Sequence, residues 1–319
     1  MSLLSALGTA ILPVLSVAAV GFLLGQVRDV EVDALGTVTI YVLTPALVFH
    51  SLATSEMSGE LAAKLIAAVA VFTLAMVGLA EAAGRLLGES EPALGALVLT
   101  SAFPNAGNYG IPLSAFAFGA VGRSTAVLFI AGQSVLMYTV GVYLASRSGE
   151  TSARGAVTEV FTLPLIYAVA AAWVARWLGV VPPTDSAAME TLRLVGDSAI
   201  PVMLLMLGIQ LANTRHGAAL SRVGVSNGLK LVVAPAVGAA IALPLGLAAG
   251  DPAVARVFVL ECGMPAAVTP LLLSIEYDSG ASDGLSGPEY VSTAIFASTL
   301  LSVATLTGLI AILKSGVLI

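Results

Sequence analysis

Two stretches of this chain place prolines, glycines and polar side chains inside otherwise apolar segments. The first reads SAFPNAGNYGIP (residues 101–112), and the second reads ECGMPAAVTP (residues 261–270). Proline removes a backbone donor and clashes with the preceding helical turn, and glycine permits conformations that other residues avoid. We therefore expect both apolar segments to unwind at these two stretches, which we call break 1 and break 2.

The chemistry that such breaks offer is binding of a ligand. Asn105 and Asn108 carry amide groups that can satisfy freed backbone groups and still donate to a ligand. The half-helix that follows a break presents N–H groups and a partial positive charge, which suits an anion. We predict a substrate site at the two breaks, made from Pro104, Asn105, Asn108, Tyr109, Pro112, Pro265, Thr269 and Pro270.

The composition places these breaks in a membrane. Of the 319 residues, 58% are hydrophobic and only 10% are charged, and the mean hydropathy is +1.01. A soluble domain carries roughly a quarter charged residues. The chain lacks the polar side chains that would cover it in water, so we expect a multi-pass protein of the cell membrane, surrounded by lipid.

Each crossing of the bilayer needs about 20 mostly apolar residues. Ten such segments follow one another along the chain, which predicts an all-α integral membrane protein. They are residues 3–25, 34–52, 61–86, 92–119, 124–145, 160–181, 189–212, 225–248, 252–277 and 290–313.

The positive charges of the short loops predict the orientation. Cytoplasmic loops carry an excess of Lys and Arg, and an extracellular N-terminus puts six arginines on the cytoplasmic side, namely Arg28, Arg85, Arg147, Arg154, Arg215 and Arg222. We therefore predict that both termini are extracellular. Lys230 and Arg256 fall inside spans, near their ends, and we expect both to extend toward the membrane surface.

The prolines also indicate an internal repeat. Pro13 and Pro164 lie in the first and sixth spans, Pro45 and Pro201 in the second and seventh. Pro45 and Pro112 are about as far apart as Pro201 and Pro270. Two halves with five spans each must insert in opposite orientations, as in many secondary transporters. We predict a first repeat over residues 1–146, a cytoplasmic linker over 147–158 and an inverted second repeat over 159–319; unrelated kinks are the alternative.

Catalysis is not indicated. The chain has two histidines and one cysteine, and it contains no HExxH or GxSxG motif that could supply a metal site or a nucleophile. We expect no enzyme activity, no cofactor, no metal and no nucleic-acid partner.

The two breaks, FPNAGNYGIPL and MPAAVTPLLLSIEY, together with the closing YVSTAIFASTLLSVATL, resemble the auxin efflux carrier family. That family includes the plant PIN carriers and many bacterial and archaeal transporters, and it is related in fold to bile-acid-type sodium symporters. The resemblance implies a homodimeric elevator transporter with crossing broken helices 4 and 9. Helices 1, 2, 6 and 7 would form its scaffold, and helices 3–5 and 8–10 its moving transport domain.

The resemblance also implies roles for individual residues. The substrate carboxylate would lie at the crossover, near Pro104, Asn105, Pro112 and Pro270. Tyr138 would face the substrate, whereas Val48, beside His50, holds the place of a serine that faces it in the plant carriers. Glu60 and Lys64 would form a polar support site with Gln133, although their spacing also fits a helix-surface ion pair. Because Val48 departs from the plant carriers, the identity of the substrate does not transfer, and it is an auxin-like or another carboxylate.

Ionisable residues inside spans are costly and are therefore candidates for function. Glu261, Asp197 and His50 can carry a proton or bind a cation, or they can serve as structural hydrogen-bond partners. The sequence thus favours a secondary transporter that exports a small organic anion, driven by the membrane potential. The alternative is a carboxylate symporter coupled to H⁺ or Na⁺.

Overall fold

The computed structural model describes residues 7–148, 163–213, 222–277 and 286–317, so Arg154, Arg215 and most of the predicted linker lie outside it. The first half contains η1 (Leu7–Ile11), α2 (Leu12–Val27), α3 (Val32–Val38), η2 (Thr39–Leu43), α4 (Thr44–Ala53), α5 (Gly59–Leu86), α6 (Ala93–Ala102), η3 (Ala106–Gly110), α7 (Ile111–Leu136), η4 (Met137–Gly141), α8 (Val142–Ala145) and η5 (Ser146–Ser148). The second half contains α10 (Pro164–Leu178), α11 (Ala187–Asn213), α12 (Gly224–Gly228), η6 (Leu229–Val233), α13 (Ala234–Ala242), α14 (Pro252–Cys262), α15 (Thr269–Tyr277) and α16 (Gly287–Ser315).

Seven helical stretches of the described residues are long and apolar enough to cross a membrane. They are Gly8–Val27, Ala34–Ala53, Gly59–Leu86, Ala106–Ala145, Ala187–Ala212, Gly224–Ala242 and Gly287–Ser315. Ala93–Ala102 and Pro164–Leu178 are apolar but shorter. The protein is therefore an all-helical integral membrane protein, while the count of ten crossings and the inverted repeat stay predictions.

The differences from the predicted spans arise at the breaks and at one glycine. The predicted fourth and ninth spans are each divided in two, into α6 and the start of α7 and into α14 and α15. The predicted loop before the fifth span lies inside α7, which is interrupted at Gly119, where φ is 64°. This left-handed conformation favours glycine.

Four π-helical turns share one sequence feature, a proline two residues after their last residue. The prolines that follow η1, η2, η3 and η6 in this way are Pro13, Pro45, Pro112 and Pro235. A proline has no N–H, and its ring crowds the carbonyl four residues earlier. The preceding turn widens in response, and such π turns are frequent at functional sites.

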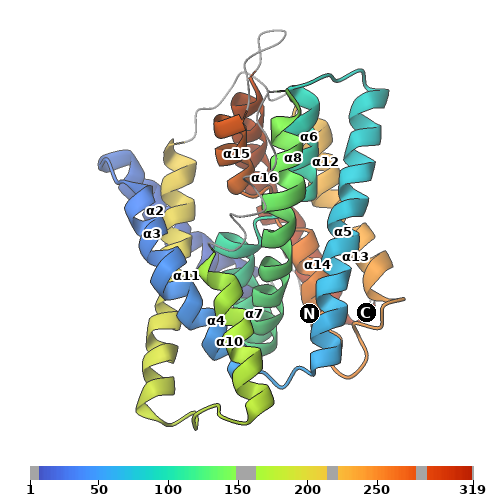
Figure 1. Ribbon diagram of the computed structural model, residues 1–319. Coiled ribbons are helices and arrows are strands. Elements are labelled where there is room, and N and C mark those ends of the chain that lie inside the picture. Colours follow the sequence, from blue (N-terminus) through green and yellow to red (C-terminus); the bar gives the residue numbers. More distant parts are fainter. Residues whose placement is uncertain (1–6, 149–162, 214–221, 278–285, 318–319) are drawn as a thin grey trace.

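The helices pack in two groups, which Figure 1 separates from left to right. In the α11 group, α2 lies along α11, and α4 packs against α10 and α11. In the α14 group, α5 packs against α6 and α7, α14 against α7 and α13, and α16 against α6 and α15. A Cβ at Gly208 of α11 would overlap the carbonyl oxygen of Ala18 in α2, so these two backbones touch, as small residues permit in membranes.

Large apolar side chains cover the outer faces of the helices. Examples from different helices are Leu23, Leu74, Trp177, Leu194 and Leu301, all more than half exposed. Lipid tails cover such side chains in a bilayer at no cost in hydrogen bonds. This distribution agrees with the membrane location that the composition predicts.

Candidate functional site

The two breaks pair with each other in the interior of the protein. The backbone N–H of Asn105 donates to the carbonyl of Pro265 at 2.8 Å, and the N–H of Ala267 donates to the carbonyl of Phe103 at 2.9 Å. Pro104 and Ala266 lie between them as an antiparallel bridge. Each break thus satisfies backbone groups that the other has freed, as a membrane interior requires.

Two side chains from neighbouring helices hold the paired breaks in place. Gln133 of α7, which is 2% exposed, donates through Nε2 to the carbonyl of Pro104 at 2.8 Å. Ser298 of α16 accepts from the backbone N–H of Ala266 at 3.1 Å. Gln133 was expected to support the site, whereas Ser298 lies in the closing stretch YVSTAIFASTLLSVATL but was not predicted as a site residue.

A cavity of about 470 Å³ lies where break 1 and the start of α15 face the α11 group. Its size suits a small organic ligand. Parts of three π-helical turns, η2, η3 and η4, lie in its wall, together with residues of α10 and α11. Six of the predicted site residues contribute to this wall, namely Pro104, Asn105, Asn108, Gln133, Tyr138 and Thr269.

Asn105 lies in the wall of this cavity and carries an unsatisfied hydrogen-bond donor. Its side chain is 5% exposed, and its Nδ2 atom has no hydrogen-bond partner. A buried donor left unpaired costs about 1–3 kcal/mol. Helical turns begin at Ala106, the next residue, and at Thr269. Both residues are in the cavity wall, so the positive ends of two helix dipoles border the same cavity.

The described wall of the cavity contains no Asp, Glu, Lys, Arg or His. An anion in this space would be bound by amide and backbone donors and by helix dipoles, without a cationic side chain. Sites that hold anions at helix N-termini work in this way.

Five other predicted residues lie outside the cavity wall. Val48 is fully buried within α4, and Tyr109 is buried with its hydroxyl 3.4 Å from Ser302 Oγ. Pro112 and Pro270 are the second residues of α7 and α15. Pro112 lies two residues after the last residue of the π turn η3, within a continuous helical stretch, whereas Pro270 lies at a helix start, which suits proline. Pro265 contributes its backbone carbonyl to the pairing of the breaks.

The predicted support pair lies at the start of α5. Lys64 Nζ and Glu60 Oε1 are 2.7 Å apart, with side chains 41% and 78% exposed. The hydrogen bonds of the described residues do not connect this pair to Gln133, which bonds to Pro104 instead. Glu60 and Lys64 therefore form an exposed i,i+4 ion pair, which was the alternative that their spacing allowed.

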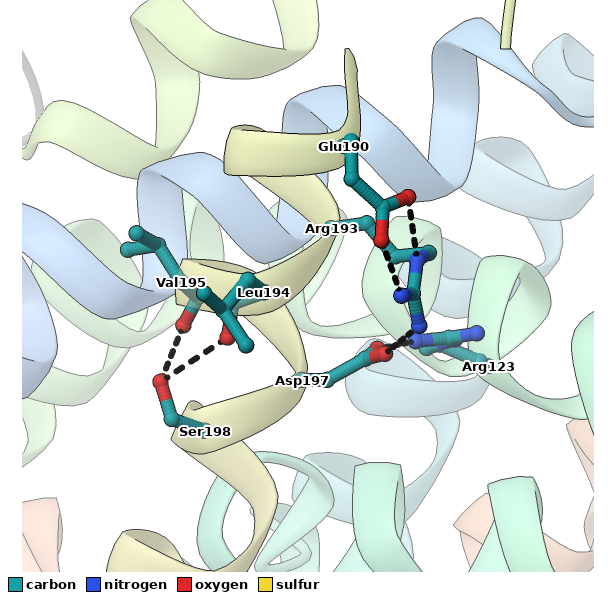
Figure 2. A network of polar contacts seen from close by, with 7 residues as sticks. All are labelled: Arg123, Glu190, Arg193, Leu194, Val195, Asp197 and Ser198. Atoms are coloured by element: carbon teal, nitrogen blue, oxygen red, sulfur yellow. Dashed lines mark hydrogen bonds and ion pairs between the residues drawn. The ribbon is translucent and has the colours of Figure 1, made fainter. Parts of the chain in front are cut away.

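Asp197 belongs to a network of charges between the two helix groups (Figure 2). It forms ion pairs with Arg123 of α7 and with Arg193, four residues earlier in α11. Arg193 also pairs with Glu190 at 2.5 Å. His50 of α4 is within electrostatic reach of these charges. The sequence could not reveal the contact between Arg123 and Asp197, because the two residues are far apart in the chain.

Glu261 is fully buried at the end of α14, where break 2 begins. Ser114 of α7 donates to its Oε1 at 2.6 Å, and a Cβ at Gly110 would overlap its carboxylate. The expectation that Lys230 extends to the membrane surface was wrong. Its side chain is fully buried, and Nζ donates to the carbonyl of Cys262 at 2.9 Å, because η6 packs among other helices, α16 and α6 included.

The sequence profile of a family described as "Membrane transport protein" matches residues 6–162 and 156–310. The chain belongs to this family. It is the auxin efflux carrier family that the two breaks resemble.

Named relatives span nearly the whole chain. An "Uncharacterized transporter" of Methanothermobacter thermautotrophicus is 29% identical over 307 residues, which are 93% of this chain and 95% of the relative. A protein of Rhizobium meliloti named "Putative malonate transporter" is 25% identical over 318 residues, 97% of this chain and 96% of the relative. A transporter of Methanocaldococcus jannaschii is 21% identical over 278 residues, 84% of this chain and 88% of the relative.

Proposed function

We propose that this member of the membrane transport protein family exports a small organic carboxylate across the cytoplasmic membrane by potential-driven uniport. The observation that carries the proposal is the unpaired Nδ2 donor of Asn105, a residue of the cavity wall, in a cavity that two helix N-termini also line. A carboxylate provides the acceptor that this donor lacks, and its charge suits the positive ends of both half-helices.

The size and lining of the cavity support a small carboxylate. Tyr41, Tyr138 and the amide donors line about 470 Å³, which accommodates a dicarboxylate or an aromatic acid. The relative in Rhizobium meliloti carries malonate in its name, so short dicarboxylates are the first candidates.

The packing of the helices supports an elevator movement of the α14 group against the α11 group. The cavity lies between the two groups, and it shares Val32, Gln210 and Val268 with a second hollow of about 410 Å³. The charge network around Asp197 lies farther along α11: Asp197 is 13 residues before Gln210, about 20 Å away along the helix. We propose that the cavity opens on the Gln210 side, which the loop arginines make cytoplasmic, and that the protein works as a homodimer with both termini outside.

The membrane potential supplies the driving force. With the cell interior negative, outward movement of an anion gains about 2.3 kcal/mol per charge per 100 mV. The alternative is symport with H⁺ or Na⁺, for which Glu261 is the buried candidate. Asp197 is a weaker candidate, because two arginines already neutralise it.

The test is flux through the purified protein in liposomes with a clamped potential. A panel of malonate, malate and indole-3-acetate is offered, with Na⁺ and pH equal on both sides. We expect flux of at least one acid that follows the potential and is lost in Asn105→Ala. Flux that needs a Na⁺ or H⁺ gradient would favour the symporter, and absence of flux for every acid would contradict the carboxylate class.

A further inference from the structure

Lys230 is a buried cation that the proposed binding of substrate does not use. It lies in the π-helical turn η6, and its side chain is fully buried. An ammonium group in a membrane interior is costly unless it is paired. Its position therefore needs a compensating negative group in the α14 group of helices.

The first such group is the C-terminal end of α14. Within the break that follows this helix, the carbonyls of Val259, Leu260 and Glu261 accept hydrogen bonds from later backbone N–H groups. The carbonyl of Cys262, the last residue of α14, accepts from Lys230 Nζ at 2.9 Å. Half-helix C-terminal ends of this kind coordinate the coupling cation in many secondary transporters.

The second group is the carboxylate of Glu261. It is fully buried, its Oε2 atom has no hydrogen-bond partner, and it interacts electrostatically with Lys230. No direct ion pair between them is found among the described residues. The ammonium thus acts on the carboxylate through space, in a medium where such interactions are strong.

The ring of Phe72 lies beside the ammonium. Lys230 Nζ lies 5.5 Å from the centre of the Phe72 ring, and Phe72 packs against Phe129 and Phe258. A ring face attracts a cation and takes the place of water around it. The ammonium is therefore held by a carbonyl and a ring and lies in the field of a carboxylate, which is the kind of environment that a bound cation requires.

We propose that Lys230 is a tethered cation, which occupies the end of α14 and neutralises Glu261 in place of a coupling ion. The proposal deepens the proposed function, because it gives the structural reason for transport without a Na⁺ or H⁺ gradient. It also assigns a hidden cation site: with the ammonium removed, the Cys262 carbonyl and the Glu261 carboxylate form a site for Na⁺, Li⁺ or a proton.

The test is the thermal stability of purified Lys230→Gln, which keeps a donor for the Cys262 carbonyl and loses the charge. Proteins in choline chloride, NaCl and LiCl of equal ionic strength are compared, at pH 8 and pH 6. We expect Na⁺, Li⁺ or acid to raise the Tm of Lys230→Gln by about 3 °C or more, as ligands that bind only the folded state do. The wild type and Lys64→Gln, which changes an exposed lysine, should not respond.

The double variant Lys230→Gln/Glu261→Gln makes the result specific. It lacks both charges, so its Tm should not depend on the cation. If Lys230→Gln does not fold, the proposal requires the double variant to be recovered in higher yield. The proposal is overturned if the Tm of Lys230→Gln depends on the cation no more than that of the wild type. It is also overturned if Lys230→Gln misfolds and the double variant is recovered in no higher yield.

Flux in liposomes separates this proposal from the proposed function. We expect wild-type flux to be unaffected by replacing Na⁺ with choline, and Lys230→Gln flux to fall at least several-fold in choline and to recover in Na⁺ or at pH 6. If the wild type carries none of the acids, the proposed function fails, while the stability comparison still decides the role of Lys230.

Discussion

Arg123 of α7 and Asp197 of α11 form an ion pair that joins the α14 group to the α11 group (Figure 2). Both side chains are partly exposed, at 23% and 40%, and a pair of this kind contributes up to about 1 kcal/mol. If the two groups move against each other during transport, this contact must break. The pair therefore favours the conformation described here over one in which α7 has moved along α11.

Asp197→Asn should shift this conformational equilibrium. Loss of about 1 kcal/mol corresponds to about a five-fold change in population. We expect the second conformation to become about five times more populated, measured as a second distance between spin labels at Trp177 of α10 and Leu86 of α5. Both positions are highly exposed, and Cys262 is buried.

Glu190→Gln is the matched control for Asp197→Asn. Glu190 also bonds to an arginine, but that arginine, Arg193, belongs to the same helix. Its loss should leave the distance distribution unchanged. Equal shifts in both variants would mean that the network stabilises α11 alone and does not join the two groups.

Substrate affinity should depend on the amide of Asn105. Asn105→Ala removes one hydrogen bond to a charged group, worth about 1.5–3 kcal/mol, so the Kd for the transported acid should rise about 10- to 100-fold. Asn105→Asp places a negative charge at the same point and should weaken binding further. Isothermal titration with the best acid of the flux panel measures both effects.

Asn227→Ala is the control for the asparagine variants. Asn227 is also buried, but it lies on α12, outside the cavity wall. It should bind the acid as the wild type does. Unchanged binding in Asn105→Ala would mean that the acid lies elsewhere in the protein.

The sequence was sufficient to locate the breaks, because their cause is local. Pro104 and Gly107 interrupt the first apolar segment, and Pro265 and Gly263 the second, and both interruptions are present in the structure. The structure adds a distortion that was not predicted, the π turn η2 before Pro45. Where a single residue type sets the backbone, the sequence alone predicts the result.

Contacts between distant helices could not be predicted in this way. Pairing of Asn105 with Pro265, of Arg123 with Asp197 and of Lys230 with Cys262 depends on how the helices pack. The buried end of Lys230 was missed because a lysine near a span end usually extends to the surface. The sequence shows how far Lys230 lies from the end of its span. It does not show which side of the helix faces α14.

Gln133 should stabilise the paired breaks. Gln133→Leu removes the donor to the buried carbonyl of Pro104, and an acceptor left unpaired in the interior costs about 1–3 kcal/mol. We expect the Tm of the purified protein to fall by several degrees. Ser134→Ala is the control, because Ser134 Oγ bonds to the Ile130 carbonyl of its own helix; a similar loss in both variants would argue against the support of break 1 by Gln133.

Contact between α2 and α11 should make Gly208 intolerant of a side chain. A Cβ at Gly208 would overlap the carbonyl oxygen of Ala18, and one at Gly21 would overlap that of Leu205. The helices must separate to admit a methyl group, and overpacking of this kind costs about 1–3 kcal/mol. Gly208→Ala should therefore unfold at lower temperature, measured by thiol-reactive dye binding to Cys262 as it becomes exposed.

Gly78→Ala distinguishes this effect from the general effect of alanine in a helix. Gly78 lies in α5, and a Cβ there meets no atom within 4 Å. Alanine is a better helix former than glycine by about 1 kcal/mol, so this variant should match or exceed the Tm of the wild type. A lower Tm for Gly208→Ala together with an equal or higher Tm for Gly78→Ala would support contact between the backbones of α2 and α11. A Gly208→Ala protein as stable as Gly78→Ala would mean that the two helices are not in close contact.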